Sequence, residues 1–248
     1  MKLTHASKQG LRPYQEDRFF IEQFESDKDL GVFLAVMDGH GGERVAQFCR
    51  DSLKDLIYQV MEGRKRVTLV VVKNIIKLLN EQTCEMESGT TLSLAFISYR
   101  QKKVFVGVLG DSPVIIKDSQ GQIVVSSEHN ARTNLKEREA AIKRGACYCA
   151  GYICEYSGRN GLQMTRSLGD REFKNFLDRL PELYSVKIGA ESFVALLSDG
   201  IVDPGHHDSA PLKSVILMIE KGASASDLVQ DALVRQTGDN VTAIIWVG

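Results

Sequence analysis

No run of apolar residues in this chain is long enough to cross a membrane, and residues 1–5 lack the apolar core of a signal peptide. An excess of positive charge is also missing, because the formal net charge is −1 and nucleic-acid-binding surfaces are usually basic. The sequence therefore predicts a cytoplasmic, intracellular protein that binds neither a membrane nor nucleic acid. Action inside a host cell is equally compatible with these absences.

Cysteine is scarce and odd in number. The five cysteines are Cys49, Cys84, Cys147, Cys149 and Cys154. An odd count without a signal peptide favours free thiols in a reducing compartment. The last three lie close together in the sequence, which would suit a soft-metal or redox cluster. Their spacing is not that of a usual zinc site and no histidine is near, so we expect packing thiols.

Internal repeats, low-complexity tracts and Pro/Gly-rich linkers are absent as well. A chain of 248 residues can bury a substantial core, and we expect residues 1–248 to form one catalytic domain. Hydrophobic residues make up 43% and charged residues 25%, as in ordinary globular proteins. No surface for self-association stands out in the pattern, so we expect a monomer.

Apolar residues recur at helical spacing in several segments, and short β-rich runs bounded by turn residues lie between them. The expected helices span residues 43–61, 67–82, 135–144, 211–221 and about 224–235. The expected strands span residues 18–24, 31–37, 91–99, 103–109, 114–117, 123–125, 193–197 and 241–247. Residues 146–162 show little periodicity, which predicts an irregular loop. Hairpins with separate groups of helices are typical of an α+β layered domain.

Four short acidic segments stand directly beside apolar runs. They are Glu16-Asp17, Asp38-Gly39, Asp199-Gly200 and Asp239-Asn240. A carboxylate at the end of a buried strand is costly unless its charge is compensated. Bound cations are the simplest compensation for several converging carboxylates, and oxygen ligands favour Mg²⁺ or Mn²⁺. The pattern indicates a metal-dependent hydrolase, although each Asp-Gly alone would more often form a turn.

Seven motifs follow one another in an order that resembles a known family. They are RPYQEDR (12–18), VMDGHGG (36–42), SGTT (88–91), VLGDS (108–112), TRSLGD (165–170), LSDGIVD (197–203) and GDNVT (238–242). In this order they resemble the type 2C (PPM) metal-dependent protein serine/threonine phosphatases. The resemblance implies a four-layer αββα sandwich, in which two antiparallel sheets are flanked by helices. It also implies phosphoserine/phosphothreonine proteins as substrates.

The resemblance assigns the primary metal ligands. Asp38 would bridge two Mg²⁺ or Mn²⁺ ions, Glu16 and the Gly39 carbonyl would complete one ion, and Asp199 and Asp239 would serve the other. In this family the bridging hydroxide attacks phosphorus directly, so no phosphoenzyme is expected.

Three further residues would act beside these ions. Arg12 would clamp the substrate phosphate, because a guanidinium matches two phosphate oxygens; otherwise it is simply solvated. His40 would protonate the leaving alkoxide, although a histidine here could instead bind metal. Asp17 is expected just behind the ligands, orienting a metal water or Arg12.

Other matching positions have less direct roles. Asp111 and Asp203 match positions that hold a third, weaker ion, and Arg166 is expected in an internal ion pair. The flap segment, residues 146–162, would shape substrate entry through Tyr148, Tyr152, Tyr156 and Arg159.

Three departures from the family pattern concern neighbouring positions. Pro113 replaces the usual arginine, so an ion pair is lost, and Glu128-His129-Asn130 stands where many relatives have Asp-His-Lys. The loop 204–208, with His206, His207 and Asp208, could bind a soft metal but is more readily a solvated loop.

Two other functions fit parts of the pattern. The same fold could be an inactive binding scaffold, but all four primary acidic residues are present. The protein could also act on small phosphoesters rather than on proteins.

Overall fold

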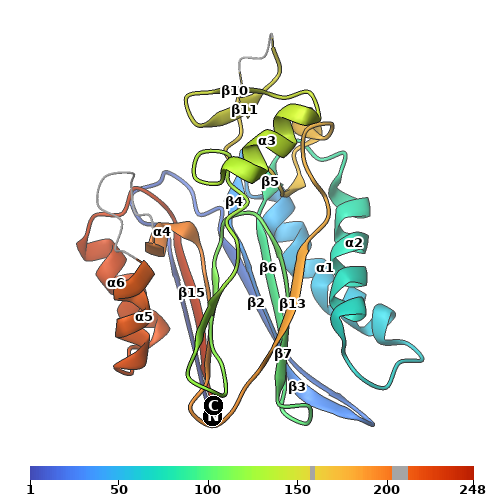
Figure 1. Ribbon diagram of the computed structural model, residues 1–248, viewed down its shortest axis with the longest axis vertical. Coiled ribbons are helices and arrows are strands. Elements are labelled where there is room, and N and C mark those ends of the chain that lie inside the picture. Colours follow the sequence, from blue (N-terminus) through green and yellow to red (C-terminus); the bar gives the residue numbers. More distant parts are fainter. Residues whose placement is uncertain (157–159, 203–211) are drawn as a thin grey trace.

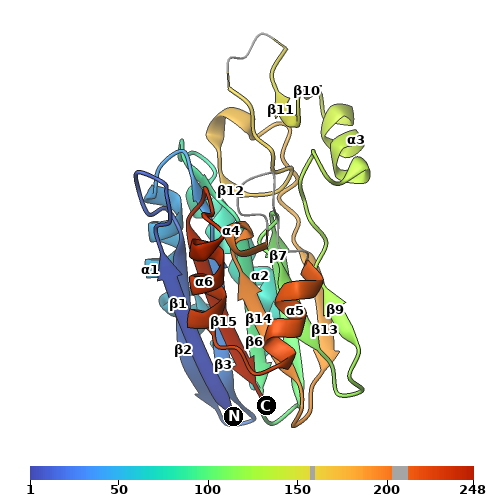
Figure 2. The ribbon, with the colours of Figure 1, turned by 90° about the vertical axis from the view of Figure 1, so that its left-hand side faces the viewer.

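Two five-stranded antiparallel sheets face each other, and helices cover both outer faces (Figures 1 and 2). The computed structural model describes residues 1–156, 160–202 and 212–248. The arrangement is the α+β, four-layer αββα sandwich that the resemblance implied. No helix in these described ranges is long and apolar enough to cross a bilayer.

The first sheet packs against the long helices α1 (Arg44–Met61) and α2 (Leu69–Thr83). Its strands, in spatial order, are β13 (Glu182–Lys187), β7 (Lys103–Leu109), β6 (Leu92–Ser98), β3 (Asp29–Met37) and β2 (Arg18–Ser26). The second sheet packs against α5 (Leu212–Glu220) and α6 (Ala225–Val234). Its order is β1 (Lys2–Lys8), β15 (Val241–Val247), β14 (Phe193–Leu197), β8 (Val114–Lys117) and β9 (Ile123–Val125).

The central strands supply two apolar layers at once. Along β3, Phe33 and Met37 face the layer under α1 and α2, whereas Leu34 and Val36 face the layer between the sheets. Successive side chains of a strand point to opposite faces, so a strand covered on both sides must be apolar at nearly every position. This explains the unbroken apolar run that precedes Asp38.

Helix boundaries agree closely with their sequence signals. Ser224 caps α6 by accepting a hydrogen bond from the Asp227 backbone N–H, while the Asp227 side chain accepts from the Ser224 N–H. The third helix, α3 (Leu135–Lys143), is capped by the Asn134 side chain and ends before Gly145, which has φ 102°.

Two strands of the five-stranded sheets were not expected from the sequence. Strands β1 and β13 each lie at an edge of a sheet, and their side chains are mostly half-buried or exposed. Edge strands need few apolar residues, so neither shows the run or the alternation that reveals a central strand.

The prediction of an irregular loop over 146–162 was wrong for part of that segment. Strands β10 (Cys147–Cys149) and β11 (Tyr152–Cys154) form a hairpin whose turn residues, Ala150 and Gly151, both have positive φ. Three-residue strands joined by Ala-Gly lack the usual Asn-Gly signal, which is why periodicity did not find them. The hairpin and α3 stand at the end of the molecule opposite the chain termini (Figure 1).

All five cysteines are free thiols, as expected. Cys147 and Cys154 face each other across the hairpin, and Cys149 is exposed, so the expectation of packing thiols was wrong for Cys149. Asp203, Arg159, Pro211 and the loop 204–208 lie outside the described residues.

Candidate active site at the strand ends

A cavity of about 650 Å³ lies where several strands of both sheets end. Asp38 follows β3, Asp111 follows β7, and Asp239 lies just before β15. Asp199 begins the short helix α4 (Asp199–Val202), directly after β14 and Ser198. The residues from the sequence motifs that line the cavity are Arg12, Asp38, Gly39, His40, Gly41, Thr91, Asp111, Asp170, Asp199 and Asp239.

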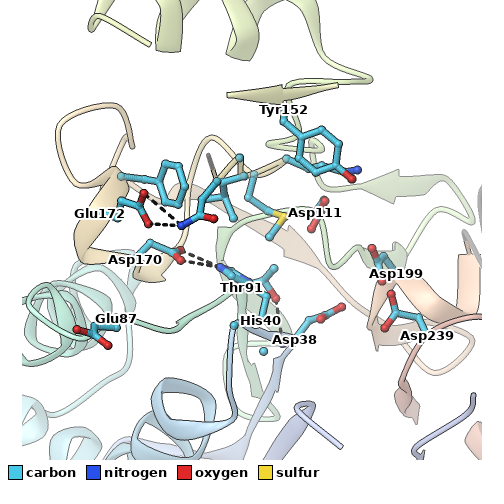
Figure 3. A pocket seen from close by; sticks show the side chains of 18 of the residues that line it. Asp38, His40, Glu87, Thr91, Asp111, Tyr152, Asp170, Glu172, Asp199 and Asp239 are labelled. Atoms are coloured by element: carbon cyan, nitrogen blue, oxygen red, sulfur yellow. Dashed lines mark hydrogen bonds and ion pairs between the residues drawn. The ribbon is translucent and has the colours of Figure 1, made fainter. Parts of the chain in front are cut away.

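The acidic residues lie close enough to affect one another's charge. Figure 3 shows Asp199 and Asp239 side by side, with Asp38 to their left and Asp111 to their upper left. Loss of hydration raises the pKa of Asp38, and repulsion from Asp17, Asp199 and other carboxylates raises it further. The pKa of Asp199 is raised for the same two reasons, with Asp111 and Asp239 its strongest neighbours.

These carboxylates fit hard divalent cations as compensating charges. Oδ1 of Asp199 is buried without a hydrogen-bond partner, and the donor set consists of oxygens alone. Over the described residues, however, no three acidic, histidine or cysteine side chains are already arranged to hold an ion. The side chains would therefore have to turn toward a bound cation.

Glu16 lies beside this group but is engaged elsewhere. Its carboxylate accepts a hydrogen bond of 2.6 Å from the Gly42 N–H, and its own N–H donates to Asn240 Oδ1 over 2.8 Å. Gly39 allows the close approach, since a Cβ there would lie 2.5 Å from the Glu16 carbonyl oxygen. The backbone therefore holds Glu16 against the segment that carries Asp38.

Asp17 is buried beneath the cavity. Its Oδ2 accepts a hydrogen bond of 2.7 Å from Thr242, while its Oδ1 has no partner. Burial raises the pKa of Asp17 despite this hydrogen bond. The residue therefore lies behind the cavity wall rather than in it, which agrees with an indirect role.

Arg12 lies on the loop between β1 and β2, and its side chain is 47% exposed. It donates to Asp239 Oδ2 over 2.6 Å and to the Gly238 carbonyl over 3.0 Å. Asn240 ties down the same loop by donating to the Gln9 and Tyr14 carbonyls. Among the described residues that line the cavity, Arg12 is the one lysine or arginine, and its guanidinium lies where a phosphate could replace Asp239 as its partner.

His40 lies in the short strand β4 (Gly39–His40), and its Nε2 is 2.9 Å from both carboxylate oxygens of Asp170. Burial lowers the pKa of His40, but the adjacent Asp170 charge outweighs it, so the net shift is upward. Asp170 was not singled out from the sequence as a functional residue.

Asp111 is buried and accepts a hydrogen bond of 2.7 Å from Asn130 Nδ2. Burial raises its pKa even with this partner. Asn130, at a departure from the family pattern, therefore contacts the residue expected at the third metal position.

Thr91 is another residue of the site that sequence reasoning did not single out. Thr91 braces Asp38, because its N–H donates to the Asp38 carbonyl and its Oγ1 accepts from the Asp38 N–H. Tyr152 reaches the cavity from the β10–β11 hairpin (Figure 3). Thr91 belongs to the SGTT motif, but no local pattern distinguished it from its neighbours, whereas Tyr152 was among the flap residues expected from the sequence to contact a substrate.

The other flap tyrosines have different surroundings. Tyr148 packs under the Arg138 guanidinium, 4.1 Å from its ring centre, and Tyr156 is almost fully exposed. Of the tyrosines proposed to contact substrate, Tyr152 alone lines the cavity. Arg166, as expected, forms an internal ion pair, with Glu137.

The chain matches the family model "Protein phosphatase 2C" over residues 1–241. It is similar to the probable protein phosphatase 2C 52 of rice (Oryza sativa subsp. japonica), with 28% identity over 250 residues. That alignment covers 97% of this chain and 49% of the rice protein, so the chain spans about half the length of that relative.

Solved structures share the fold. A serine-threonine phosphatase 2C from Toxoplasma gondii aligns with a TM-score of 0.74 at 18% identity, covering 98% of this chain and 93% of that one. The catalytic domain of the phosphatase PstP, solved with two manganese ions, aligns with a TM-score of 0.64 at 17% identity. This second alignment covers 98% of this chain and 96% of the other.

Proposed function

This chain belongs to the protein phosphatase 2C family, and we propose that it hydrolyses phosphoserine and phosphothreonine in proteins with the help of Mg²⁺ or Mn²⁺. The single observation that carries the proposal is the meeting of Asp38, Asp199 and Asp239 at one cavity, with Arg12 beside them. A nearby cation stabilises the charged form of a carboxylate whose pKa is raised. A guanidinium presents a planar fork of donors that matches two oxygens of a phosphate.

Asp38 would contact both of two tightly bound ions. Glu16 and the Gly39 carbonyl would complete one set of ligands, and Asp199 and Asp239 the other. The manganese ions of the PstP structure are consistent with two such sites. Asp111, together with Asp203, would hold a third and weaker ion. When bound, the cations supply an activated water and neutralise charge on the phosphoryl oxygens.

The chain's own groups supply the remaining steps. Arg12 would leave Asp239 and present its two-pronged guanidinium to the substrate phosphate. His40 would give a proton to the serine or threonine oxygen as the P–O bond breaks. Asp17, which is buried beneath the cavity, would orient a metal-bound water or Arg12. Water attacks phosphorus directly in this scheme, so no side chain becomes phosphorylated.

The setting of the reaction is also part of the proposal. Five free thiols suit a reducing compartment, which favours a cytoplasmic role in signalling through dephosphorylation. Tyr152 borders the cavity from the flap hairpin and would contact residues next to the phosphorylated side chain.

Hydrolysis of a phosphothreonine peptide tests the proposal. We expect phosphate release with Mn²⁺ or Mg²⁺, loss of release with EDTA, and recovery when the ion is returned. A panel of small phosphate esters run in parallel separates a protein phosphatase from a metabolite phosphatase. Peptide binding without release would support the scaffold alternative, and activity confined to the small esters would overturn the protein substrate.

A further inference from the structure

Three of the five cysteines gather in the β10–β11 hairpin. Cys147 and Cys154 are directly opposite each other in its antiparallel register, and Cys149 is paired with Tyr152. Residues opposite each other, and residues two apart on one strand, lie on the same face of a two-stranded ribbon. The three cysteines and Tyr152 therefore share one face of the hairpin, which we call the thiol face.

The opposite face anchors the hairpin to the rest of the molecule. Ile153 is fully buried in a small apolar cluster, and Tyr148 packs against the same cluster. Ile153 also exchanges two backbone hydrogen bonds with Leu162, over 2.8 and 2.9 Å. Leu162 belongs to the segment 160–164, every residue of which lines the cavity. The hairpin is thus joined through its backbone to the wall of the proposed active site.

The Cys147–Cys154 pair has the geometry that a disulfide requires. Directly opposed residues of an antiparallel pair have Cα atoms about 4.5–5.5 Å apart, and a disulfide joins Cα atoms about 4.4–6.8 Å apart. The Cys154 thiol donates to the Cys147 carbonyl oxygen over 3.8 Å, so it is turned toward the opposite strand. Both cysteines are half-buried free thiols, which leaves them accessible to a small oxidant.

The remaining cysteines lack this arrangement. Cys49 is fully buried, and loss of hydration raises the pKa of its thiol to about 12, so the reactive thiolate is scarce near neutral pH. Cys84 follows α2, outside the hairpin, and Cys149 is opposite an aromatic residue. Burial raises the pKa of Cys154, and negative charge on the two other hairpin thiols raises it further. The three hairpin thiols therefore lie close enough to affect one another's charge.

We propose that Cys147 and Cys154 are a modification site, at which hydrogen peroxide converts the two thiols into a reversible disulfide. One thiolate attacks a peroxide oxygen and becomes a sulfenic acid, while the other oxygen leaves as water after taking up a proton. The second thiol then attacks the oxidised sulfur, the S–S bond forms and a second water leaves. Two thiols and one peroxide thus give one disulfide and two waters, and the two electrons from sulfur reduce the O–O bond. In a reducing compartment, cellular thiols would return the disulfide to the dithiol.

Tyr152 connects this site to the cavity. It lies on the thiol face two residues from Cys154, and it lines the cavity (Figure 3). A Cβ at Gly161 would lie 2.8 Å from the Tyr152 Cβ, so Tyr152 already packs closely against the cavity wall. A cross-link would fix the hairpin and Tyr152 with it. This consequence rests on the proposed function: the disulfide should hinder peptides, which extend to Tyr152, and spare p-nitrophenyl phosphate, which is too small to need that contact.

Peptide mapping tests the cross-link without any measurement of activity. The full chain is treated with hydrogen peroxide, its remaining thiols are alkylated, and it is digested with trypsin and chymotrypsin. Cleavage after Arg144 and after the hairpin tyrosines gives the peptides 145–148, 149–152 and 153–156, with one cysteine in each. We expect 145–148 and 153–156 to remain joined until a dithiol reductant releases them. Alkylation of both cysteines, their oxidation without a cross-link, or a cross-link to 149–152 would overturn the inference.

Serine variants provide matched controls for the mapping. Cys149→Ser keeps the opposed pair and should form the same cross-link, whereas Cys154→Ser should lose it. Cys84→Ser leaves the hairpin unchanged and should behave as the wild type. Failure of Cys149→Ser to form the cross-link would mean that the opposed pair does not react by itself, which also contradicts the proposal.

Kinetics after removal of the peroxide test the effect on the cavity. The cross-linked, Mn²⁺-loaded protein should show a KM for a phosphothreonine peptide raised by about threefold or more, the size expected when one aromatic contact is lost. Its turnover of p-nitrophenyl phosphate should stay unchanged, and Cys154→Ser should not respond to peroxide. An unchanged KM, or equal losses on both substrates, would overturn the link to Tyr152. If the untreated wild type hydrolyses neither substrate, the proposed function fails, while peptide mapping still decides whether the disulfide forms.

Discussion

Glu137 and Asp199 are both partly enclosed carboxylates, yet the chain surrounds them in opposite ways. Glu137 on α3 accepts hydrogen bonds from Thr165 Oγ1 and from Nε and Nη2 of Arg166, over 2.7, 3.1 and 2.6 Å. Burial raises the pKa of Glu137, but these contacts outweigh it and the net shift is downward. Asp199 has further carboxylates as neighbours and one oxygen without a partner, and its pKa is raised.

The difference separates a structural acid from one that awaits a ligand. The chain itself supplies the positive charge for Glu137 through Arg166, so the Glu137–Arg166 ion pair can hold α3 against the 165–170 segment. Over the part of the chain that the structure describes, no such charge pairs with Asp38 or Asp199, because Arg12 reaches only Asp239 among the cavity acids. An ion from solution would complete this second region.

The largest effect should come from Asp38, the carboxylate proposed to contact both ions. Asp38→Ala should lower turnover of a phosphothreonine peptide by more than about 10²-fold, because both ions would lose a shared ligand. Glu137→Gln is the matched change in the other region and should leave tight Mn²⁺ binding intact. Near-normal activity of the folded, metal-saturated Asp38→Ala variant would contradict this contrast, in which the chain compensates the charge of Glu137 and a cation compensates the cavity acids.

A smaller loss is expected at Arg12. Arg12→Ala should slow the phosphopeptide and p-nitrophenyl phosphate alike, by about 10-fold or more, because both present the same phosphate to the guanidinium. Arg12→Lys should recover part of the rate, since an ammonium keeps the charge but lacks the fork. A loss confined to peptide substrates would place Arg12 at a peptide-contact surface instead.

Sequence patterns predicted the central strands better than the edges. The bounds of β7, β14 and β15 agree with the expected ranges, because strands covered on both faces leave continuous apolar runs. The side chains of strand β1 are half-buried or exposed. The β10–β11 hairpin is held mainly by its turn and by contacts with other segments. Short-range periodicity carries little of that information.

The same limit applies to the site. The motif order predicted that Asp38, Asp199 and Asp239 belong together, and the structure brings all three to one cavity. Their roles as ligands remain predictions. The contact between His40 and Asp170 joins residues 130 positions apart through a small sheet, and neither residue's neighbours in the sequence indicate it.

Asp111 should show an effect smaller than that of Asp38. Asp111→Ala would remove a carboxylate from the proposed third site but leave the two primary ions bound, and turnover should fall at every metal concentration. Calorimetric titration with Mn²⁺ should lose one weak binding event and keep the tight ones. Loss of the tight events would instead move Asp111 into the primary group and change the ligand assignment.

Asn130→Ala sharpens the same test. Asn130 donates to Asp111 without being a proposed ligand itself. Its removal should therefore lower the affinity of the weak Mn²⁺ site, although the Asp111 carboxylate is still present. No change in binding or turnover in either variant would reduce Asp111 to a turn residue. In that case the departure at Pro113 and Asn130 would mark the loss of the third site.

The smallest effects, on stability, should have opposite signs in the two regions. With EDTA present, the folded state holds protons on Asp38 and Asp199 that the unfolded state releases above about pH 4. The free energy of unfolding should therefore fall as pH rises from about 4 toward the raised pKa values. Asp199→Asn should raise metal-free stability at pH 7 and flatten this decline.

Glu137 should behave in the reverse manner, because its folded pKa is lowered. Its contribution is present above the unfolded value of about 4.3 and is lost as pH falls through the folded value. Glu137→Gln should cost about 2 kcal/mol at pH 7, since a charged hydrogen-bond acceptor of Arg166 is removed. Urea unfolding in EDTA between pH 4 and 8 measures both variants together. A loss of metal-free stability in Asp199→Asn as large as that in Glu137→Gln would mean that Asp199 is already compensated by the chain, and the reason for placing a cation beside it would disappear.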